Sequence, residues 1–259
     1  MKILISLSLI IFSLTTFAQI KTEKVEYKQG DTLLEGFAAY DSTSSEKRPG
    51  VIVVHEWYGL NEYAKMRAEE LAELGYFAFA ADIYGKGVRA TNNEEAGKLA
   101  GKYRKDRELM RARINAAVDK IRDFDLVEND NIAAIGYCFG GGVVLELARS
   151  GTDIDGVVSF HGNLDTPNPD QTKNVKAQVL VLHGADDPHV PQEQVHNFME
   201  EMDSADVKWQ MNFYSDAVHS FTNPKSGADP STGVAYNERA AKRSWEAMKI
   251  FFEYIFKNN

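Results

Sequence analysis

The chain has 259 residues, a formal net charge of −9 at pH 7 and a single cysteine, Cys138. This length suffices for one large α/β domain with a full core, and the acidic balance disfavours nucleic-acid or stable membrane partners. One cysteine excludes an internal disulfide and a zinc site built from cysteines.

Residues 1–18 have the organisation of a secretory signal peptide. A lysine at position 2 precedes an apolar run over residues 3–17, and the run ends in a small-x-small pattern at Ala18. We expect cleavage after Ala18, export to the periplasm or the medium, and a mature domain over residues 19–259. An uncleaved membrane anchor is the alternative, although the run is short for a transmembrane helix. In an exported protein a lone cysteine cannot form an internal bridge, which favours a chemical role for Cys138.

Strand-like and helix-like segments alternate along the rest of the chain. Two β-like runs flank the turn at Gly30 and predict a hairpin, and most later strands are short continuous apolar runs, as in strands buried on both faces. In the last predicted helix, Ile250 is expected on the buried side together with Met248 and Phe252. The predicted strands cover residues 25–28, 33–40, 51–55, 77–83, 132–135, 156–160, 177–182 and 207–214, and the predicted helices cover 61–74, one or two parts of 92–124, 143–148, 192–202 and 236–257.

This alternation predicts the fold class and the location of the site. Strands that alternate with helices form a mostly parallel sheet, here eight-stranded, with helices on both faces. Neither repeats nor linkers interrupt residues 19–259, so we expect one domain there. In such sheets function is found at the carboxyl ends of the strands. The polar residues that directly follow each strand are therefore the candidates for a site.

The strongest functional motif is the run from Gly136 to Gly140, with Cys138 at its centre. It lies between a predicted strand and a predicted helix, which is the nucleophile-elbow pattern G-x-S-x-G with cysteine in the serine position. Side chains at positions 136 and 140 would collide with so tight a turn. The N–H groups and dipole at the start of the helix favour a thiolate and a developing oxyanion. We therefore expect Cys138 to be a nucleophile; a buried structural cysteine is the alternative.

A cysteine nucleophile needs a base, and in this order of motifs the acid follows the nucleophile and the base comes last. Asp187 fits the spacing G-x-x-D-x-x-V-P after the strand 177–182 and is the predicted acid, with Asp186 as the fallback. His219 follows the last strand and is the predicted base. His161 and His183 end earlier strands, where we expect them to line the pocket or to bond to the backbone.

The loop after the strand 51–55 contains two further candidates. The backbone N–H of Phe139 is the first predicted oxyanion donor, and that of Trp57 is the second. Glu56 would then lie close to the sulfur of Cys138, where a carboxylate raises the pKa of a thiol or competes with a histidine for its proton. A buried carboxylate that pairs with an arginine or caps a turn is the alternative for Glu56.

A metal site is only weakly indicated by the histidines near the predicted acid. His183, Asp187 and His189 lie close together in the sequence but lack a recognised ligand spacing. We therefore expect no bound metal.

Together these motifs resemble those of the dienelactone hydrolase family. The resemblance extends from about residue 25 to the C-terminus and rests on G-x-C-x-G-G at 136–141, H-E-W-x-G-L-N at 55–61, D-I-Y-G at 82–85, the Asp187 motif and H-S-F at 219–221. It implies an α/β-hydrolase fold and a Cys-His-Asp hydrolase of carboxylic esters or lactones, without a metal or organic cofactor. It also implies that Glu56 holds the proton arrangement of the cysteine until substrate binds.

Two departures from the family concern its substrate. Dienelactone-cleaving members bind the substrate carboxylate through arginines, one of them shortly after the histidine, but residues 220–224 contain none. Lys86 occupies the region where another arginine is expected, and Arg89 is the nearest one. A lysine cannot reproduce the bidentate grip of a guanidinium. We therefore expect a small-molecule ester or lactone other than dienelactone, with Tyr84, Lys86 and His161 as substrate-binding residues.

Two other classes of function stay open. One is a thiol-redox or non-catalytic protein, in which an exposed cysteine is oxidised reversibly. The other is an exported binding protein on a hydrolase fold. A peptidase on this fold would need a cap or propeller domain, for which the chain has no room.

Overall fold

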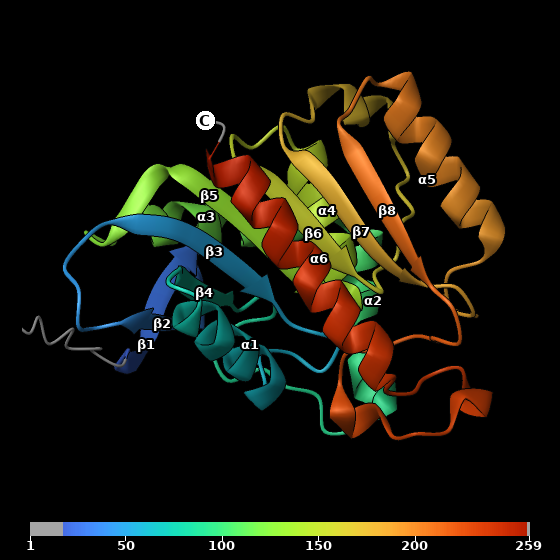
Figure 1. Ribbon diagram of the computed structural model, residues 1–259, viewed down its shortest axis with the longest axis horizontal. Helices are drawn as coiled ribbons and strands as arrows, with labels where there is room; N and C mark the ends of the chain where they lie inside the picture. Colours follow the sequence, from blue (N-terminus) through green and yellow to red (C-terminus); the bar gives the residue numbers. More distant parts are fainter. Residues whose placement is uncertain (1–17, 258–259) are drawn as a thin grey trace, which may run out of the picture.

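The computed structural model describes residues 18–257 (Figure 1), so that the predicted signal peptide lies, apart from Ala18, outside the described residues. Their strands are β1 (Ile20–Gln29), β2 (Thr32–Asp41), β3 (Arg48–Val54), β4 (Phe77–Ala81), β5 (Val127–Tyr137), β6 (Gly156–Phe160), β7 (Gln178–Gly184) and β8 (Trp209–Tyr214). They form one sheet in the order β1-β2-β4-β3-β5-β6-β7-β8. The pairs β1–β2 and β2–β4 are antiparallel and the other five are parallel. The predicted mostly parallel eight-stranded sheet is confirmed.

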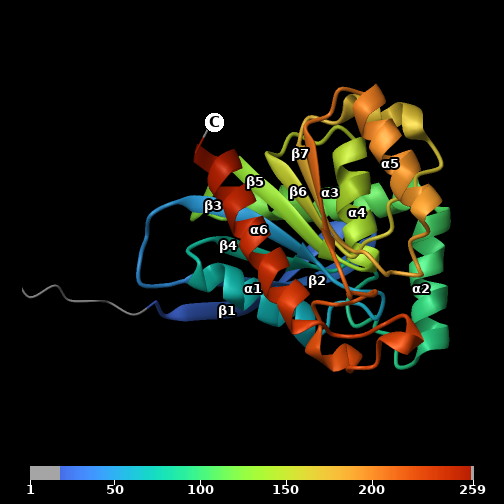
Figure 2. The same cartoon turned by 45° about the vertical axis from the view of Figure 1, so that its right-hand side comes forward.

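Helices cover both faces of this sheet. One face carries α1 (Glu62–Glu73) and α6 (Glu238–Lys257), which lie in front of the strands in Figure 1. The opposite face carries α2 (Asn93–Lys105), α3 (Arg107–Arg122), α4 (Phe139–Arg149) and α5 (Gln192–Ser204), as the turned view in Figure 2 also shows. Each face buries its own apolar cluster, which explains why the central strands are apolar on both sides. Within residues 18–257 no helix has the length and apolar character needed to cross a bilayer.

Three short 3-10 helices lie in the connections that the sequence predicts as loops. They are η1 (Pro169–Asn174), η2 (Pro224–Ser226) and η3 (Pro230–Thr232). Each begins with a proline, whose fixed φ suits the first position of a helix. The two-helix interpretation of residues 92–124 is also confirmed, because Asp106 ends α2 and caps α3.

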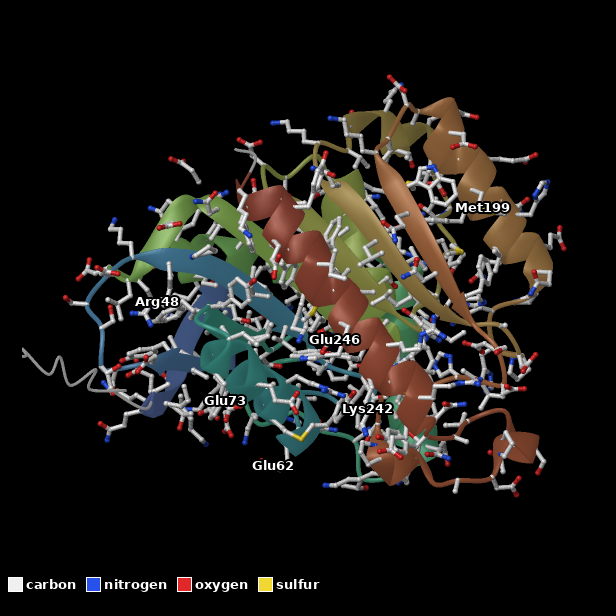
Figure 3. All side chains as sticks on the ribbon, viewed as in Figure 1. Arg48, Glu62, Glu73, Met199, Lys242 and Glu246 are labelled. Atoms are coloured by element: carbon white, nitrogen blue, oxygen red, sulfur yellow. The ribbon has the colours of Figure 1, made fainter. Side chains whose placement is uncertain are left out.

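Two details differ from the expectations. The hairpin strands are longer than predicted, because β1 and β2 pair along their whole length from Ile20 to Gln29. The expectation that Ile250 lies on the buried side of α6 is wrong, since 68% of the residue is exposed. It follows Lys242 and Glu246 at intervals of four residues, and these two side chains project from the outer side of the helix in Figure 3.

A buried ion-pair network fixes the helix that follows the elbow. Glu146 on α4 is fully buried, and its carboxylate accepts hydrogen bonds from Arg111 on α3 and from Arg149 one turn further along α4. Arg149 also pairs with Glu201 on α5 at 2.8 Å. Removal of one member would leave a buried charge unpaired, at a cost of about 3–5 kcal/mol. The network therefore holds α3, α4 and α5 in one arrangement behind the site.

Glycines at two positions allow the elbow to form between β5 and α4. A Cβ atom at position 136 would lie 2.0 Å from the carbonyl oxygen of Gly140, and one at position 140 would lie 2.4 Å from the carbonyl oxygen of Val54. The backbone of the buried helix α4 and that of the central strand β3 are closely packed and cannot move away from such contacts. The predicted collision at both positions is thus confirmed.

We expect Gly136→Ala to destabilise the fold by at least about 3 kcal/mol, since the added methyl group overlaps backbone atoms. Gly97→Ala is the matched control, because Gly97 lies on the exposed side of α2 and an added methyl group would have no atom within 4 Å outside the backbone of its own helix. The control should be stabilised by about 0.5–1 kcal/mol, as expected for alanine in a helix. Urea denaturation followed by circular dichroism measures both; equal stability of the two variants would contradict the steric argument.

Candidate active site

Cys138 lies on the turn between β5 and α4 in a conformation that few residues other than glycine adopt. Its backbone has φ +53° and ψ −114°, and it stands at the N-cap position of α4. Its N–H group donates hydrogen bonds to two acceptors, the carbonyl oxygen of Phe160 at 3.0 Å and Nδ1 of His161 at 3.1 Å. The turn is therefore both strained and tightly bonded, which is typical of a site where geometry matters.

The structure brings the predicted acid and base to the sulfur. His219 Nε2 lies 3.1 Å from Cys138 Sγ, and His219 Nδ1 lies 2.8 Å from Asp187 Oδ2. The second oxygen of Asp187 accepts a hydrogen bond from the N–H of His189 at 2.8 Å. Asp186, the fallback acid, is exposed instead. The three groups come from the ends of β5, β7 and β8, which meet at the carboxyl edge of the sheet as expected.

Burial and charge shift the pKa values of this acid and base in opposite directions. Burial alone would lower the pKa of His219, but the charge of Cys138 and the hydrogen bond to Asp187 outweigh it and raise that pKa to about 10. Burial alone would raise the pKa of Asp187, but its bonds with His219 and His189 hold it below the ordinary value. At neutral pH a protonated imidazole thus lies between a carboxylate and the sulfur. A cation at this position stabilises negative charge that develops next to it.

Glu56 is buried, and its carboxylate faces the loop that carries His219. Ser220 donates a hydrogen bond to Oε1 at 2.7 Å, and Asn223 donates one to Oε2 at 2.7 Å. Burial raises the pKa of Glu56 despite these two bonds. A position close to the sulfur was expected; the hydrogen bonds of both oxygens are made with Ser220 and Asn223, which follow His219 in the chain. Neither predicted alternative, an arginine pair or a turn cap, describes this arrangement.

The two predicted oxyanion donors have N–H groups without a backbone acceptor in the described part of the chain. Phe139 is the first residue of α4, where the N–H cannot bond within the helix. Trp57 lies in a turn closed by the hydrogen bond from the N–H of Gly59 to the carbonyl of Glu56. The hydroxyl of Tyr84 donates to the carbonyl of Trp57 at 2.9 Å and fixes this turn.

The predicted substrate-binding residues occupy three different environments. Tyr84 is buried in an aromatic group with His55 and Phe139, at ring-centroid distances of 4.9 and 5.4 Å. Lys86 lies on the surface, where its ammonium pairs with Glu26. His161 is fully buried, with both ring nitrogens bonded to protein groups. The polar atoms of Lys86 and His161 thus already have protein partners, and a direct contact of these residues with substrate stays a prediction.

Arg89 is the arginine nearest to the position where the family is expected to have one, and its side chain also has protein partners. Its guanidinium donates to the carbonyls of Leu60 and Val88 and lies 3.6 Å from Asp82. These contacts hold the loop after β4 against the loop after β3. Arg89 therefore links the two loops. A carboxylate ligand could bind its guanidinium only by displacing the carbonyl groups or the Asp82 carboxylate that already contact it.

Three residues next to His219 were not identified from the sequence. Ser220 and Asn223 bind Glu56, and Thr222 binds His161 through its hydroxyl at 2.7 Å. All three are buried. The signal that could have identified them is the run of short polar side chains that directly follows the base.

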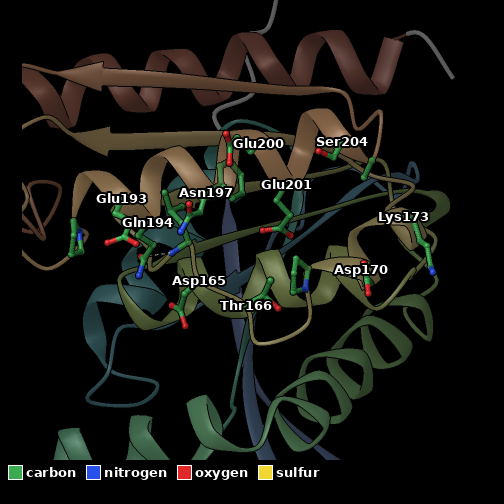
Figure 4. Close-up of a pocket in the computed structure, with 15 residues that line it drawn as sticks. Asp165, Thr166, Asp170, Lys173, Glu193, Gln194, Asn197, Glu200, Glu201 and Ser204 are labelled. Carbon is green, nitrogen blue, oxygen red and sulfur yellow. Dashed lines mark hydrogen bonds between the residues drawn. The ribbon is translucent and has the colours of Figure 1, made fainter.

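A separate cavity of about 790 Å³ lies between η1 and α5, away from these groups (Figure 4). Asp165, Gln194 and Glu201 are among its lining residues, whereas Cys138 and His219 are not. Several of its polar groups have protein partners: Glu201 pairs with Arg149, Asp165 pairs with Arg107, and the side chain of Gln194 accepts from the N–H of Leu164. Within residues 18–257, no group of three or more histidine, cysteine, aspartate or glutamate side chains is placed to hold a metal ion.

We expect His219→Gln to slow alkylation of Cys138 by iodoacetamide at pH 7 by at least about tenfold, because the thiolate loses the cation that faces it. The rate is measured by mass spectrometry on the folded protein. The same reaction in denaturant is the control, since there both proteins must react alike. Equal rates for the two folded proteins would show that His219 does not influence the sulfur.

Comparison with known proteins agrees with this geometry. A sequence profile described as the dienelactone hydrolase family matches residues 34–256. The solved structure named m3DLH is 39% identical with a TM-score of 0.88, covering 91% of this chain and 98% of its own. The dienelactone hydrolase-like promiscuous phosphotriesterase P91 from metagenomic libraries is 38% identical with a TM-score of 0.86 and the same coverage. A protein of Aquifex aeolicus named "Putative carboxymethylenebutenolidase" is 25% identical, covering 91% of this chain and 99% of that protein. The chain therefore belongs to the dienelactone hydrolase family, and the predicted class of enzyme, a hydrolase of ester or lactone bonds, is confirmed.

Proposed function

We propose that the chain hydrolyses carboxylic esters or lactones through an acyl-cysteine intermediate, with Cys138 as nucleophile, His219 as base and acid, and Asp187 as the group that orients His219. The observation that carries the proposal is the pair of contacts made by one imidazole, 3.1 Å to the sulfur and 2.8 Å to the carboxylate. A nucleophile, a base within hydrogen-bond reach and a third group that orients the base are the signature of covalent catalysis.

In the acylation step, the thiolate of Cys138 adds to the carbonyl carbon and forms a C–S bond. The carbonyl electrons move to the oxygen, where the N–H groups of Phe139 and Trp57 stabilise the negative charge. The C=O bond then re-forms and the bond to the leaving oxygen breaks. The leaving alkoxide takes the proton of His219, whose raised pKa keeps that proton available at neutral pH.

In the deacylation step, neutral His219 takes a proton from a water molecule as the water oxygen adds to the acyl carbon. Collapse of this second intermediate breaks the C–S bond and releases the carboxylic acid. The thiolate then faces the protonated imidazole again, as at the start of the cycle. Asp187 stays ionised throughout and holds Nδ1, which keeps Nε2 directed at the sulfur.

Glu56 supports this cycle through the base rather than through the sulfur. Its carboxylate holds Ser220 and Asn223, which flank the turn that follows His219. Its negative charge also lies near enough to interact with the imidazolium of His219. We therefore propose that Glu56 stabilises the charged, correctly placed form of the base.

The substrate is proposed to be a small ester or lactone without a carboxylate that needs an arginine clamp. No arginine follows His219 in residues 220–224, and the guanidinium of Arg89 already has partners. The name carboxymethylenebutenolidase, given to the relative from Aquifex aeolicus, describes a lactone hydrolase. That name supports hydrolysis of a lactone bond. The existing contacts of the Arg89 guanidinium argue against a substrate that carries a carboxylate.

A phosphotriester is a second candidate substrate, favoured by the similarity to the promiscuous phosphotriesterase at 38% identity. The thiolate of Cys138 would form a P–S bond as one P–O bond breaks, and the alkoxide or aryloxide would leave with the proton of His219. Water that gives a proton to neutral His219 would then add to phosphorus and break the P–S bond, with the oxyanion donors directed at the phosphoryl oxygen. A neutral triester, like a neutral ester, needs no cationic clamp.

A panel of esters, lactones and one phosphotriester tests these roles. We expect Cys138→Ala to lower kcat by at least about 1,000-fold and Asp187→Asn by about 100-fold or more, since loss of an orienting carboxylate leaves the imidazole misplaced. Asp186→Asn is the matched control and should be unchanged, because that side chain is exposed. Full activity of Cys138→Ala would exclude the acyl-cysteine scheme. Fast alkylation without turnover of any substrate would favour the thiol-redox alternative.

The raised pKa of His219 predicts a pH dependence that differs between leaving groups. For an alkyl ester, kcat/KM should fall as pH rises through about 10, because His219 then lacks the proton that the alkoxide needs. For the 4-nitrophenyl ester of the same acid the fall should be absent, since nitrophenolate leaves without a proton. Initial rates are corrected for spontaneous hydrolysis. Identical profiles for the two esters would show that His219 is not the acid.

A further inference from the structure

We propose that His161 and Thr222 form a bridge that positions the nucleophile and the base relative to each other. Both are positioning residues: they act through Cys138 and His219, so the inference rests on the roles proposed for those two. The bridge runs from the backbone of the elbow, through one imidazole ring, to the loop that carries the base.

The first half of the bridge joins His161 to the elbow. Its Nδ1 lies 3.1 Å from the backbone nitrogen of Cys138, and an amide can only donate. Nδ1 must therefore be unprotonated. Complete burial, together with the charges of His219, Arg67 and His183, lowers the pKa of His161 well below its ordinary value, so the ring is neutral. A neutral ring with a bare Nδ1 carries its proton on Nε2.

The second half joins His161 to the loop of the base. Nε2 lies 2.7 Å from the hydroxyl oxygen of Thr222 and donates its proton there. The hydroxyl of Tyr63 on α1 lies 2.7 Å from the same oxygen. The carbonyl of Thr222 accepts a hydrogen bond from Arg67, one turn further along α1, at 3.0 Å. Thr222 is thus fixed from the elbow side and from the helix side at once.

Backbone strain gives an independent reason to assign a positioning role. Five non-glycine residues in the described chain have positive φ, and three of them are Cys138 at 53°, His161 at 40° and Ser220 at 58°. Each such conformation is strained and persists only where the surroundings enforce it. These three residues lie in the three segments that the bridge connects. The contacts of His161 and Thr222 are the ones that hold the strained segments together.

The ring of His161 also lies directly against the base. Its centroid is 5.4 Å from that of His219 and 5.2 Å from that of Phe221, with edge-to-face interplanar angles of 66° and 77°. A neutral, fully bonded ring at this distance limits the movement of His219 without competing for its proton. Asp187 and His161 therefore restrain the base from two sides.

Thr222→Val tests the bridge, because valine keeps the shape of threonine but leaves the Nε2–H of His161 without its acceptor. A buried donor left without its acceptor is destabilising, so we expect kcat for a 4-nitrophenyl ester to fall about five- to 100-fold while KM changes by less than about threefold. Thr222→Ser restores the hydroxyl and should recover most of the lost kcat. His161→Asn, which tolerates positive φ, repeats the test from the other end and serves if the valine variant does not fold.

Alkylation of Cys138 as a function of pH separates positioning from general structural damage. If the bridge positions His219, Thr222→Val should react at least about fivefold more slowly than the unsubstituted protein at pH 7 and at the same rate at pH 10. Unfolding would instead expose Cys138, which is only 8% accessible in the folded protein, and would change the rate at both pH values. A changed rate at both pH values in both variants, or unsubstituted behaviour of Thr222→Val and His161→Asn in both assays, would overturn the bridge.

The same experiments distinguish this inference from the proposed function. If the unsubstituted protein hydrolyses no ester but the alkylation rate still falls in Thr222→Val at pH 7 only, the bridge is supported and the hydrolytic role is wrong. If esters are hydrolysed and neither variant affects kcat or alkylation, the hydrolytic role is supported and the bridge is wrong.

Discussion

The close approach of the backbone at Gly136 to that at Gly140 is the constraint on which the site depends. Only hydrogen fits where a Cβ atom would lie 2.0 Å from a carbonyl oxygen, so the chain can turn from β5 into α4 without an intervening loop. The turn forces Cys138 to a positive φ and places its sulfur at the start of a helix. Two buried ion pairs, Glu146 with Arg111 on α3 and Arg149 with Glu201 on α5, then fix that helix against its neighbours. A rigid element therefore carries Cys138, the proposed nucleophile.

His219, the proposed base, is held in a different way, because it lies on a long connection rather than on a helix or strand. Its position follows from contacts with three separate segments. Asp187 binds the imidazole ring of His219, and Glu56 binds Ser220 and Asn223. His161 binds the hydroxyl of Thr222 in the same loop. Loops commonly carry functional residues on a rigid scaffold. Here buried polar side chains from other segments bind the residues of the loop by hydrogen bonds. Each of these buried groups needs its partner, because burial of an unpaired polar group is costly.

The fold and the central part of the site could be predicted from the sequence because both follow from order along the chain. Alternating apolar segments determined the sheet, and the sequence order of Cys138, Asp187 and His219 placed them after successive strands at one edge. Side-chain direction was not predictable in the same way. His161 ends a strand, as expected, but whether its ring meets substrate or backbone depends on the loop opposite it. Lys86 is near the site in sequence, yet a carboxylate on β1 draws its ammonium to the surface.

The start of α4 differs from that of every other α-helix in the described chain. The helices α1, α2, α3, α5 and α6 each carry a glutamate in the first turn, which neutralises the partial positive charge of the helix end. The first turn of α4 contains no acidic residue. The sulfur of Cys138 lies at this helix end instead. An oxygen anion formed on a carbonyl group bonded to the sulfur would also lie near the partial positive charge. The fold thus leaves one helix end electrostatically uncompensated, at the point where a reaction would generate negative charge.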